Sequence, residues 1–150
     1  MGDIAQEHWA SKWVESRIGQ IPEGSWMVGG NAIGRGWYEE GRHVGYVVPG
    51  RGLVIGYNGN EVMLNQYEVL SGDQSQYRWI GGRGPCRPKH FVPLFGGHEA
   101  DRRELYIAKT WYNDQEVVGK VGPHLEKGMS FGMNGHEIGA YEYQVLALLG

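Results

Sequence analysis

The sequence repeats itself, and this constrains the fold more than any other feature. The segment IGRGWYEEGRHVGYVVPG, which starts at Ile33, corresponds to IAKTWYNDQEVVGKVGPH, which starts at Ile107. The segment GYNGNEVMLNQYEVL, which starts at Gly56, corresponds to GMNGHEIGAYEYQVL, which starts at Gly132. Two tandem, pseudo-symmetric copies therefore fill nearly the whole chain, copy one over about 13–70 and copy two over about 77–148.

Composition and turn signals predict an all-β fold. The 150 residues include 26 Gly, 9 Tyr and 6 Trp, whereas glycine averages about 7% of residues in globular proteins. Short apolar segments recur every 8 to 12 residues or so, with turn sequences between them. We expect a single domain, residues 1–150, built as a sandwich-like or closed arrangement of short strands.

Short apolar runs between turn signals predict nine strands. They are residues 25–28, 33–38, 45–48, 53–57, 67–70, 91–95, 105–111, 117–121 and 143–148. Residues 3–17 are compatible with a helix or with a strand that begins at Trp13. We interpret Trp9, Trp13, Trp79 and Trp111 as packing residues, because large aromatic side chains carry much apolar surface.

Charge and cysteine usage exclude several classes of protein. The formal net charge is −3 and no basic cluster is present, so the electrostatic pattern of a nucleic-acid-binding protein is missing. The single cysteine, Cys86, cannot form an intrachain disulfide. No apolar run approaches the roughly 20 residues of a membrane span, and the first residues lack the apolar core of a signal peptide.

The two copies differ first in a loop. Gly29 lies 67 positions before its counterpart Gly96, whereas the tryptophans that follow, Trp37 and Trp111, are 74 positions apart. Copy one therefore lacks seven residues of the loop that carries two carboxylates in copy two. These carboxylates are Glu99 and Asp101.

The second difference is chemical, because Lys120 of copy two corresponds to Tyr46 of copy one. A carboxylate accepts hydrogen bonds and an ammonium donates them. Together, the acidic loop and Lys120 could hold neighbouring hydroxyls of a sugar. The alternative is a surface salt bridge between Lys120 and Glu99 or Asp101, which would be worth about 0–1 kcal/mol.

The order of these motifs over two copies resembles the DM9 repeat family. Copy two contains Trp79, Gly96-Gly97, Glu99-Ala100-Asp101, Leu105-Tyr106-Ile107-Ala108-Lys109-Thr110, Gly119-Lys120-Val121, Asn134-Gly135-His136-Glu137 and Tyr143-Gln144-Val145-Leu146. Copy one contains Trp13, Gly29-Gly30, Ile33-Gly34-Arg35-Gly36, Asn58-Gly59-Asn60-Glu61 and Tyr67-Glu68-Val69-Leu70.

The resemblance implies a lectin-like protein that recognises mannose-type glycans in innate immunity and needs no cofactor. Similar proteins are cytosolic or are secreted without a signal peptide, and some form homodimers. Their sugar contacts are an acidic residue after the glycine pair and the lysine of Gly-Lys-Val, which correspond here to Glu99 and Lys120. The family more often has Asp at the first position, and Asp101 is a neighbouring candidate. Copy one lacks both groups, so we expect one site per chain.

Two other functions stay open. One is a non-catalytic protein-interaction module, which a large apolar surface patch would favour. The other is a glycoside hydrolase that uses two carboxylates from Glu99, Asp101 and Glu116. No nucleophile motif or phosphate-binding loop is present, and we expect a protein without catalytic activity.

The remaining polar residues are assigned structural roles. Four histidines, His90, His98, His124 and His136, have no metal-ligand spacing, so no metal site is predicted. Glu61 and Glu137 recur in the Asn-Gly-x-Glu motif of both copies. A repeated glutamate beside a turn is typical of a side chain that accepts hydrogen bonds from turn amides.

Overall fold

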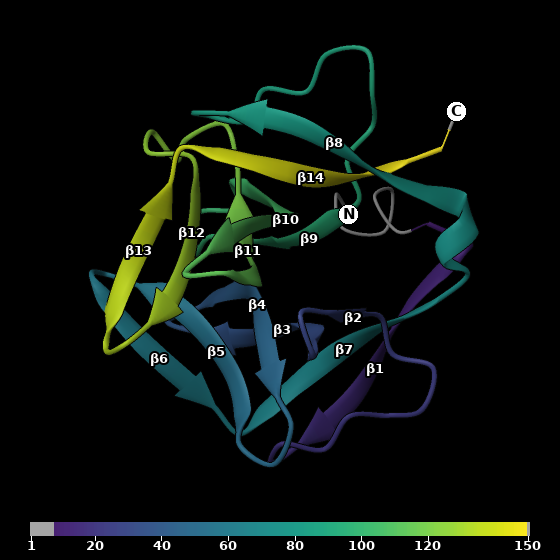
Figure 1. The fold of residues 1–150 in the computed structure, drawn as a ribbon, viewed down its shortest axis with the longest axis vertical. Helices are drawn as coiled ribbons and strands as arrows, with labels where there is room; N and C mark the ends of the chain where they lie inside the picture. The colour runs from purple at the N-terminus through teal and green to yellow at the C-terminus, as the bar shows by residue number, and fades with distance from the viewer. Residues whose placement is uncertain (1–7, 150) are drawn as a thin grey trace.

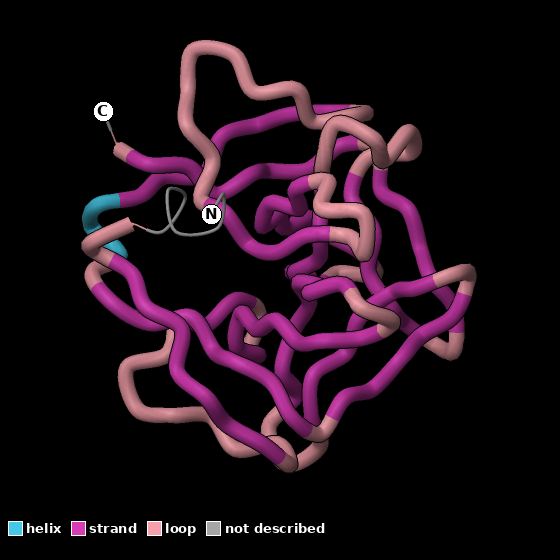
Figure 2. Tube along the Cα trace, turned by 180° about the vertical axis from the view of Figure 1, so that it is seen from behind, coloured by secondary structure: helices cyan, strands magenta, loops and turns pink. Residues whose placement is uncertain are grey.

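The computed structural model describes residues 8–149 and confirms the all-β prediction (Figure 1). Figure 2 shows strands throughout the described chain and a short helical turn, η1 (Gln74–Gln76). The first half of the protein contains β1 (Ser11–Arg17), β2 (Met27–Val28), β3 (Asn31–Tyr38), β4 (Gly41–Val48), β5 (Gly52–Tyr57), β6 (Asn60–Leu64) and β7 (Gln66–Gly72). The second half contains β8 (Tyr77–Arg83), β9 (Phe95–His98), β10 (Glu104–Tyr112), β11 (Gln115–Val121), β12 (Met129–Met133), β13 (His136–Ala140) and β14 (Glu142–Leu148).

The strands form one sheet whose order reads equivalently from both ends. The order is β1-β7-β3-β4-β5-β6-β13-β12-β11-β10-β14-β8, with β2 on β3 and β9 on both β10 and β4. From either end, β1 corresponds to β8, β7 to β14, β3 to β10, β4 to β11, β5 to β12 and β6 to β13. All the pairings are antiparallel. The two halves meet in the middle of this order, where β6 pairs with β13.

Two-residue turns between adjacent strands follow from their sequences. Asn58-Gly59 joins β5 to β6 with φ values of 51° and 85°, and Asn134-Gly135 joins β12 to β13 with 55° and 85°. Positive φ at both central positions matches the twist of a tight hairpin, and Asn-Gly is the dipeptide that adopts it most readily. The turn prediction at Asn58-Gly59 is confirmed.

The sheet folds over so that strands far apart in its order come into contact. A methyl group on Gly56 of β5 would lie 2.9 Å from the backbone oxygen of Phe131 in β12. On Gly132 of β12, it would lie 2.5 Å from the backbone oxygen of Ile55 in β5. The two backbones thus approach too closely for any side chain at these positions, and glycine is required at both.

The interior is apolar and spans both halves. The larger buried cluster draws residues from both halves, including Ile33, Val44, Ile107, Phe131 and Val145. A smaller cluster lies within the first half: Ala32, Val47, Leu53, Ile55, Tyr67 and Val69. Burial of these side chains supplies the main favourable free energy of folding.

Two glutamates bind the central hairpins to each other. Glu61 Oε1 accepts from the backbone N–H of Gly135 at 3.0 Å, and Glu137 Oε1 accepts from that of Gly59 at 2.8 Å. The backbone N–H of each glutamate also donates to the carbonyl of the same turn glycine. The predicted bonding to turn amides is therefore present, but each glutamate binds the turn of the other half. We call these four residues the glutamate clasp.

Some predictions of secondary structure are corrected. The predicted strand over 91–95 is wrong: β9 begins at Phe95, and only an isolated bridge joins Pro93 to Ala147. The strand predicted from Ser25 begins at Met27. Residues 11–17 form a strand rather than a helix, and residues 3–7 lie outside the described residues. The strands β6, β8, β12 and β13 were not predicted. The sequences of β6 and β13 carry little alternation, whereas β12 does alternate, with Met129, Phe131 and Met133 at every second position, and this signal was missed.

The prediction of buried tryptophans is correct only in part. Trp13 and Trp79 are partly buried and pack against the larger core cluster. Trp9 and Trp111 are 80% and 70% exposed, so a packing role is wrong for both. Trp37, which corresponds to Trp111, is also exposed. Trp37 and Trp111 therefore recur in both copies although neither lies in the core.

Both glutamates of the clasp should stabilise the folded protein. Glu137→Ala is expected to lower the free energy of unfolding by about 1–3 kcal/mol, because a turn amide loses a charged acceptor. Glu61→Ala should cost less, because Glu137 also accepts from the Ser130 hydroxyl. Urea denaturation measures both. Glu126→Ala, at an exposed turn residue, is the control; equal stability of all three variants would contradict a structural role for the clasp.

Candidate ligand-binding site

Lys120 is the next-to-last residue of β11 and is buried, with 3% of its surface exposed. Its Nζ lies 2.9 Å from His43 Nδ1 of β4 and 5.6 Å from the centre of the Tyr57 ring of β5. Both partners belong to the first half. The proximity of β4 to β11 therefore creates the surroundings of the lysine.

Glu99 lies in the loop that joins β9 to β10. Its backbone N–H donates to the carbonyl of Arg103 at 2.9 Å, which closes the loop. Its carboxylate Oε2 lies 2.7 Å from His124 Nε2, and the side chain is 19% exposed. Because an ionised carboxylate only accepts hydrogen bonds, His124 Nε2 is the donor.

Asp101 has a different environment from Glu99. Its carboxylate accepts from the backbone N–H of Arg103 at 3.1 Å and from Arg103 Nε at 2.9 Å, and the pair is exposed. The bonds to Arg103 lower the pKa of Asp101. Asp101 thus stabilises the loop that presents Glu99, while its own side chain remains at the surface.

Five side chains form what we call the polar cluster: Glu99, Lys120, His43, His124 and Tyr57. Edge-to-face packing of His43 and Tyr57, with ring centres 5.2 Å apart, links its two first-half members. The salt-bridge alternative fits poorly, because Glu99 is paired with His124 and Asp101 with Arg103. Lys120 hydrogen-bonds to a histidine.

Burial and charge determine the protonation states of the polar cluster. Burial lowers the pKa of Lys120, while Glu99 and Glu137 act in the opposite direction. Burial and the charge of Lys120 lower the pKa of His43 to about 4. His43 is therefore neutral near pH 7, and its Nδ1 accepts from the Lys120 ammonium.

Glu99 remains ionised in this environment. Burial alone would raise its pKa, but the hydrogen bond from His124 and the charge of Lys120 outweigh that effect, and the pKa is lowered. The polar cluster thus holds a carboxylate at its rim and an ammonium beneath it. Such a pair offers both an acceptor and a positive potential to a polar ligand.

The corresponding position of the first half is different. Tyr46, the counterpart of Lys120, donates its hydroxyl to the carbonyl of Gly132 at 2.6 Å. Burial raises the pKa of Tyr46 to about 12, so the side chain is neutral. It serves as a contact between the halves and brings no charge to that position.

Sequence reasoning missed His43, His124 and Tyr57. His43 corresponds to Val117 at the 74-residue offset, and this mismatch between copies is a signal that could have identified it. His124 was considered only as a metal ligand. Within residues 8–149, no group of three or more His, Cys, Asp or Glu side chains could hold a metal ion. The same residues contain no helix long and apolar enough to cross a membrane.

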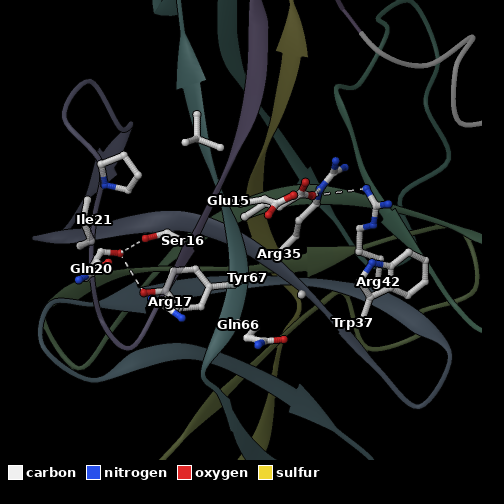
Figure 3. A pocket seen from close by; sticks show the side chains of 14 residues that line it. Glu15, Ser16, Arg17, Gln20, Ile21, Arg35, Trp37, Arg42, Gln66 and Tyr67 are labelled. Carbon is white, nitrogen blue, oxygen red and sulfur yellow. Dashed lines mark hydrogen bonds and ion pairs between the residues drawn. The ribbon is translucent and has the colours of Figure 1, made fainter.

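Two pockets lie near the polar cluster, of which the smaller shares Tyr57 with it and the larger shares none of its side chains. One, of about 560 Å³, is lined in part by Tyr57 and Asn58 and so adjoins the polar cluster. The larger, of about 990 Å³, lies on the first half and includes Trp37 and Arg42 (Figure 3). Arg42 immediately precedes His43 on β4, and side chains alternate along a strand. The larger pocket and the polar cluster therefore lie on opposite faces of β4.

The strand order and the polar cluster define an all-β protein with a buried charged group where two halves meet. The family model described as the DM9 repeat matches residues 31–140. The chain therefore belongs to the DM9 repeat family, as the motif order indicated.

Comparison with solved structures supports the fold. The crystal structure of the nematode sperm cell motility protein MFP2B is similar, with a TM-score of 0.66 and 13% sequence identity. The match covers 94% of this chain and 47% of that chain, so this chain spans about half its length. At this identity, the likeness concerns the fold alone. No curated protein matches the sequence.

His43 should make the folded state less stable in mild acid. Its pKa falls from 6.5 to about 4 on folding, so the unfolded chain binds more protons between these values. The free energy of unfolding should therefore decrease as pH drops from 6.5 to about 4, by about 3 kcal/mol in full. Glu99 contributes only below pH 4.5, where its stabilising effect is lost as it becomes protonated.

Urea denaturation at pH 7, 5.5 and 4.5 measures this dependence. His43→Asn keeps an acceptor for Lys120 but does not titrate, so its stability should fall less over the interval. His136→Asn, at an exposed histidine of β13, should behave as the wild type. A wild-type pH dependence in His43→Asn would disprove this assignment.

Proposed function

We propose that this DM9 protein is a non-catalytic lectin that recognises mannose-type glycans through Glu99 and Lys120, with Asp101 at the rim of the site. The observation that carries the proposal is the burial of Lys120 behind an ionised carboxylate. A buried ammonium is costly to maintain. Groups that oppose folding are expected mainly at functional sites.

The roles of the three residues follow from their exposure. Glu99 is accessible and ionised, so it can accept hydrogen bonds from sugar hydroxyls. Lys120 keeps Glu99 charged and, with two of its three N–H donors not directed at His43, can donate to a ligand oxygen that enters beside Glu99. Asp101 contributes by holding the loop and by its own exposed oxygens.

Family membership supports the ligand class. The carboxylate and the lysine stand at the positions where DM9 lectins contact sugar, which makes mannose-type glycans the natural first ligands to test. Recognition of microbial glycans in innate immunity is the biological role that we propose with it. The glutamate in place of the usual aspartate places the carboxylate one methylene farther from the backbone.

The pKa directions disfavour a glycoside hydrolase. Its general acid is a carboxylic acid with a raised pKa, held protonated near neutral pH. The pKa values of Glu99 and Asp101 are both lowered. Glu116 is engaged by Lys109, whose Nζ lies 3.1 Å from Oε2. Each of these carboxylates suits binding or ion pairing better than proton donation.

Lys120→Met tests the site without leaving a large cavity. We expect at least tenfold weaker binding to mannose-type glycans on a glycan array, because the positive charge behind Glu99 is removed. The urea midpoint should be unchanged or higher, because a buried charge is replaced by an apolar side chain of similar length. Loss of glycan binding without loss of stability therefore identifies Lys120 as a ligand-binding residue and not a structural one.

Lys109→Met is the matched control. Lys109 is also a partly buried lysine on a neighbouring strand, paired with Glu116, and its replacement should leave glycan binding at the wild-type level. Wild-type binding by Lys120→Met would remove Lys120 from the site. If neither the wild type nor the variants bind any glycan, the lectin proposal fails, and a protein-interaction module becomes the better hypothesis.

A further inference from the structure

One face of β1, β7, β3 and β4 carries a row of polar side chains from four adjacent strands. The strand registers align Glu15 with Glu68, Glu68 with Arg35, Arg17 with Gln66, and Trp37 with Arg42. Alternation along each strand directs residues two positions apart to one face. These side chains line the pocket of about 990 Å³ in Figure 3.

Glu68 lies at the centre of this pocket. Its Oε1 accepts from Arg35 Nε at 2.8 Å and lies 3.6 Å from Arg42 Nη1. Directly across the strand pair lies Glu15, and like charges in opposite positions destabilise a sheet. The fold does not require this carboxylate pair, which suggests that it serves another purpose.

Arg42 and Trp37 form the wall of the pocket. The guanidinium carbon of Arg42 lies 4.7 Å from the centre of the Trp37 ring, and the tryptophan is 57% exposed. Arg42 Nε is buried and has no hydrogen-bond partner among residues 8–149. An unpaired buried donor costs about 1–3 kcal/mol, and the rest of the Arg42 side chain, which is 20% exposed, remains accessible from the pocket.

The second half lacks this combination at the corresponding positions. In β8 and β14, Gly81 lies opposite Gln144, where the first half has Glu15 opposite Glu68. Glu116 replaces Arg42 as the partner of Trp111 in the hairpin register. The same strands thus form without these charges, so the first-half residues are not needed to build the sheet.

We propose that this pocket is a second saccharide site, specific to the first half. Glu68 Oε2 and Glu15 would accept from hydroxyls, the exposed part of the Arg42 guanidinium would donate to a hydroxyl oxygen, and the exposed face of Trp37 would contact the apolar C–H face of a sugar ring. The lining places the carboxylates Glu15 and Glu68 among the arginines Arg17, Arg35 and Arg42, so hydrogen-bond acceptors and donors alternate around the pocket. A neutral, polyhydroxylated ligand matches the alternating donors and acceptors.

The two sites are structurally separate. Arg42 and His43 are consecutive residues of β4 and point to opposite faces, so the pocket and the polar cluster share no side chain. The assignment of a saccharide ligand to this pocket rests on the side chains that line it and also on the proposed lectin function. One chain would then present two saccharide sites of different composition, which raises the avidity for a branched glycan.

The test uses the whole protein with Lys120→Met as the background, on a glycan array that carries neutral, acidic and phosphorylated glycans. This variant should retain binding to a subset of neutral glycans. Adding Trp37→Ala or Arg42→Gln should then reduce that binding at least tenfold. Adding Trp111→Ala, at the corresponding exposed tryptophan of the second half, should leave it unchanged. Circular dichroism and thermal melting verify that each double variant is folded.

Four results would overturn the second site: no residual binding in Lys120→Met, an equal loss from Trp111→Ala, a loss explained by unfolding of both Trp37→Ala and Arg42→Gln, or residual binding only to acidic or phosphorylated glycans. The proposed function fails separately. If Lys120→Met binds every glycan as the wild type does and Trp37→Ala alone abolishes binding, the pocket stands and the Glu99–Lys120 site does not.

Discussion

The structure depends on the close approach of two backbones at its centre. The carbonyl groups beside Gly56 and Gly132 occupy the space that a side chain would need, and the glutamate clasp joins the two hairpins next to this contact. Charged hydrogen bonds to backbone amides are stronger than neutral ones. They hold the two hairpins together along with the β6–β13 pairing and the hydrogen bond from Tyr46 to Gly132.

This central contact also creates the polar cluster. Lys120 is buried because β4 packs against β11, and the partner that satisfies its ammonium, His43, comes from the other half. Glu137 links the two features, because it belongs to the clasp and its charge also opposes the burial that lowers the pKa of Lys120. The site and the contact between halves are therefore one electrostatic unit, and neither half contains the polar cluster alone.

The two halves carry different polar side chains at corresponding positions. The second half carries Glu99 and Lys120, where the first half has a shorter loop and the neutral Tyr46. The first half carries Glu15, Glu68 and Arg42 on one face of its strands, where the second half has glycine, glutamine and glutamate. The strands pair with either set of polar side chains, because pairing depends on backbone hydrogen bonds and on the apolar side chains. The polar side chains that strand pairing does not require can therefore differ between the halves.

The sequence by itself determined the all-β class, the Asn-Gly turns, most of the long strands and the DM9 family, because these depend on local turn chemistry and on the order of motifs along the chain. It also identified Glu99 and Lys120 as the residues that copy one lacks. It did not identify Trp111 as exposed or β9 as starting at Phe95. Only the tertiary structure decided that His43 and Tyr57 complete the polar cluster, that each clasp glutamate binds the opposite turn, and that four strands align a polar pocket. These features arise from contacts between residues about 70 or more positions apart or from several strands at once, and local patterns carry no information on which distant backbones will approach each other.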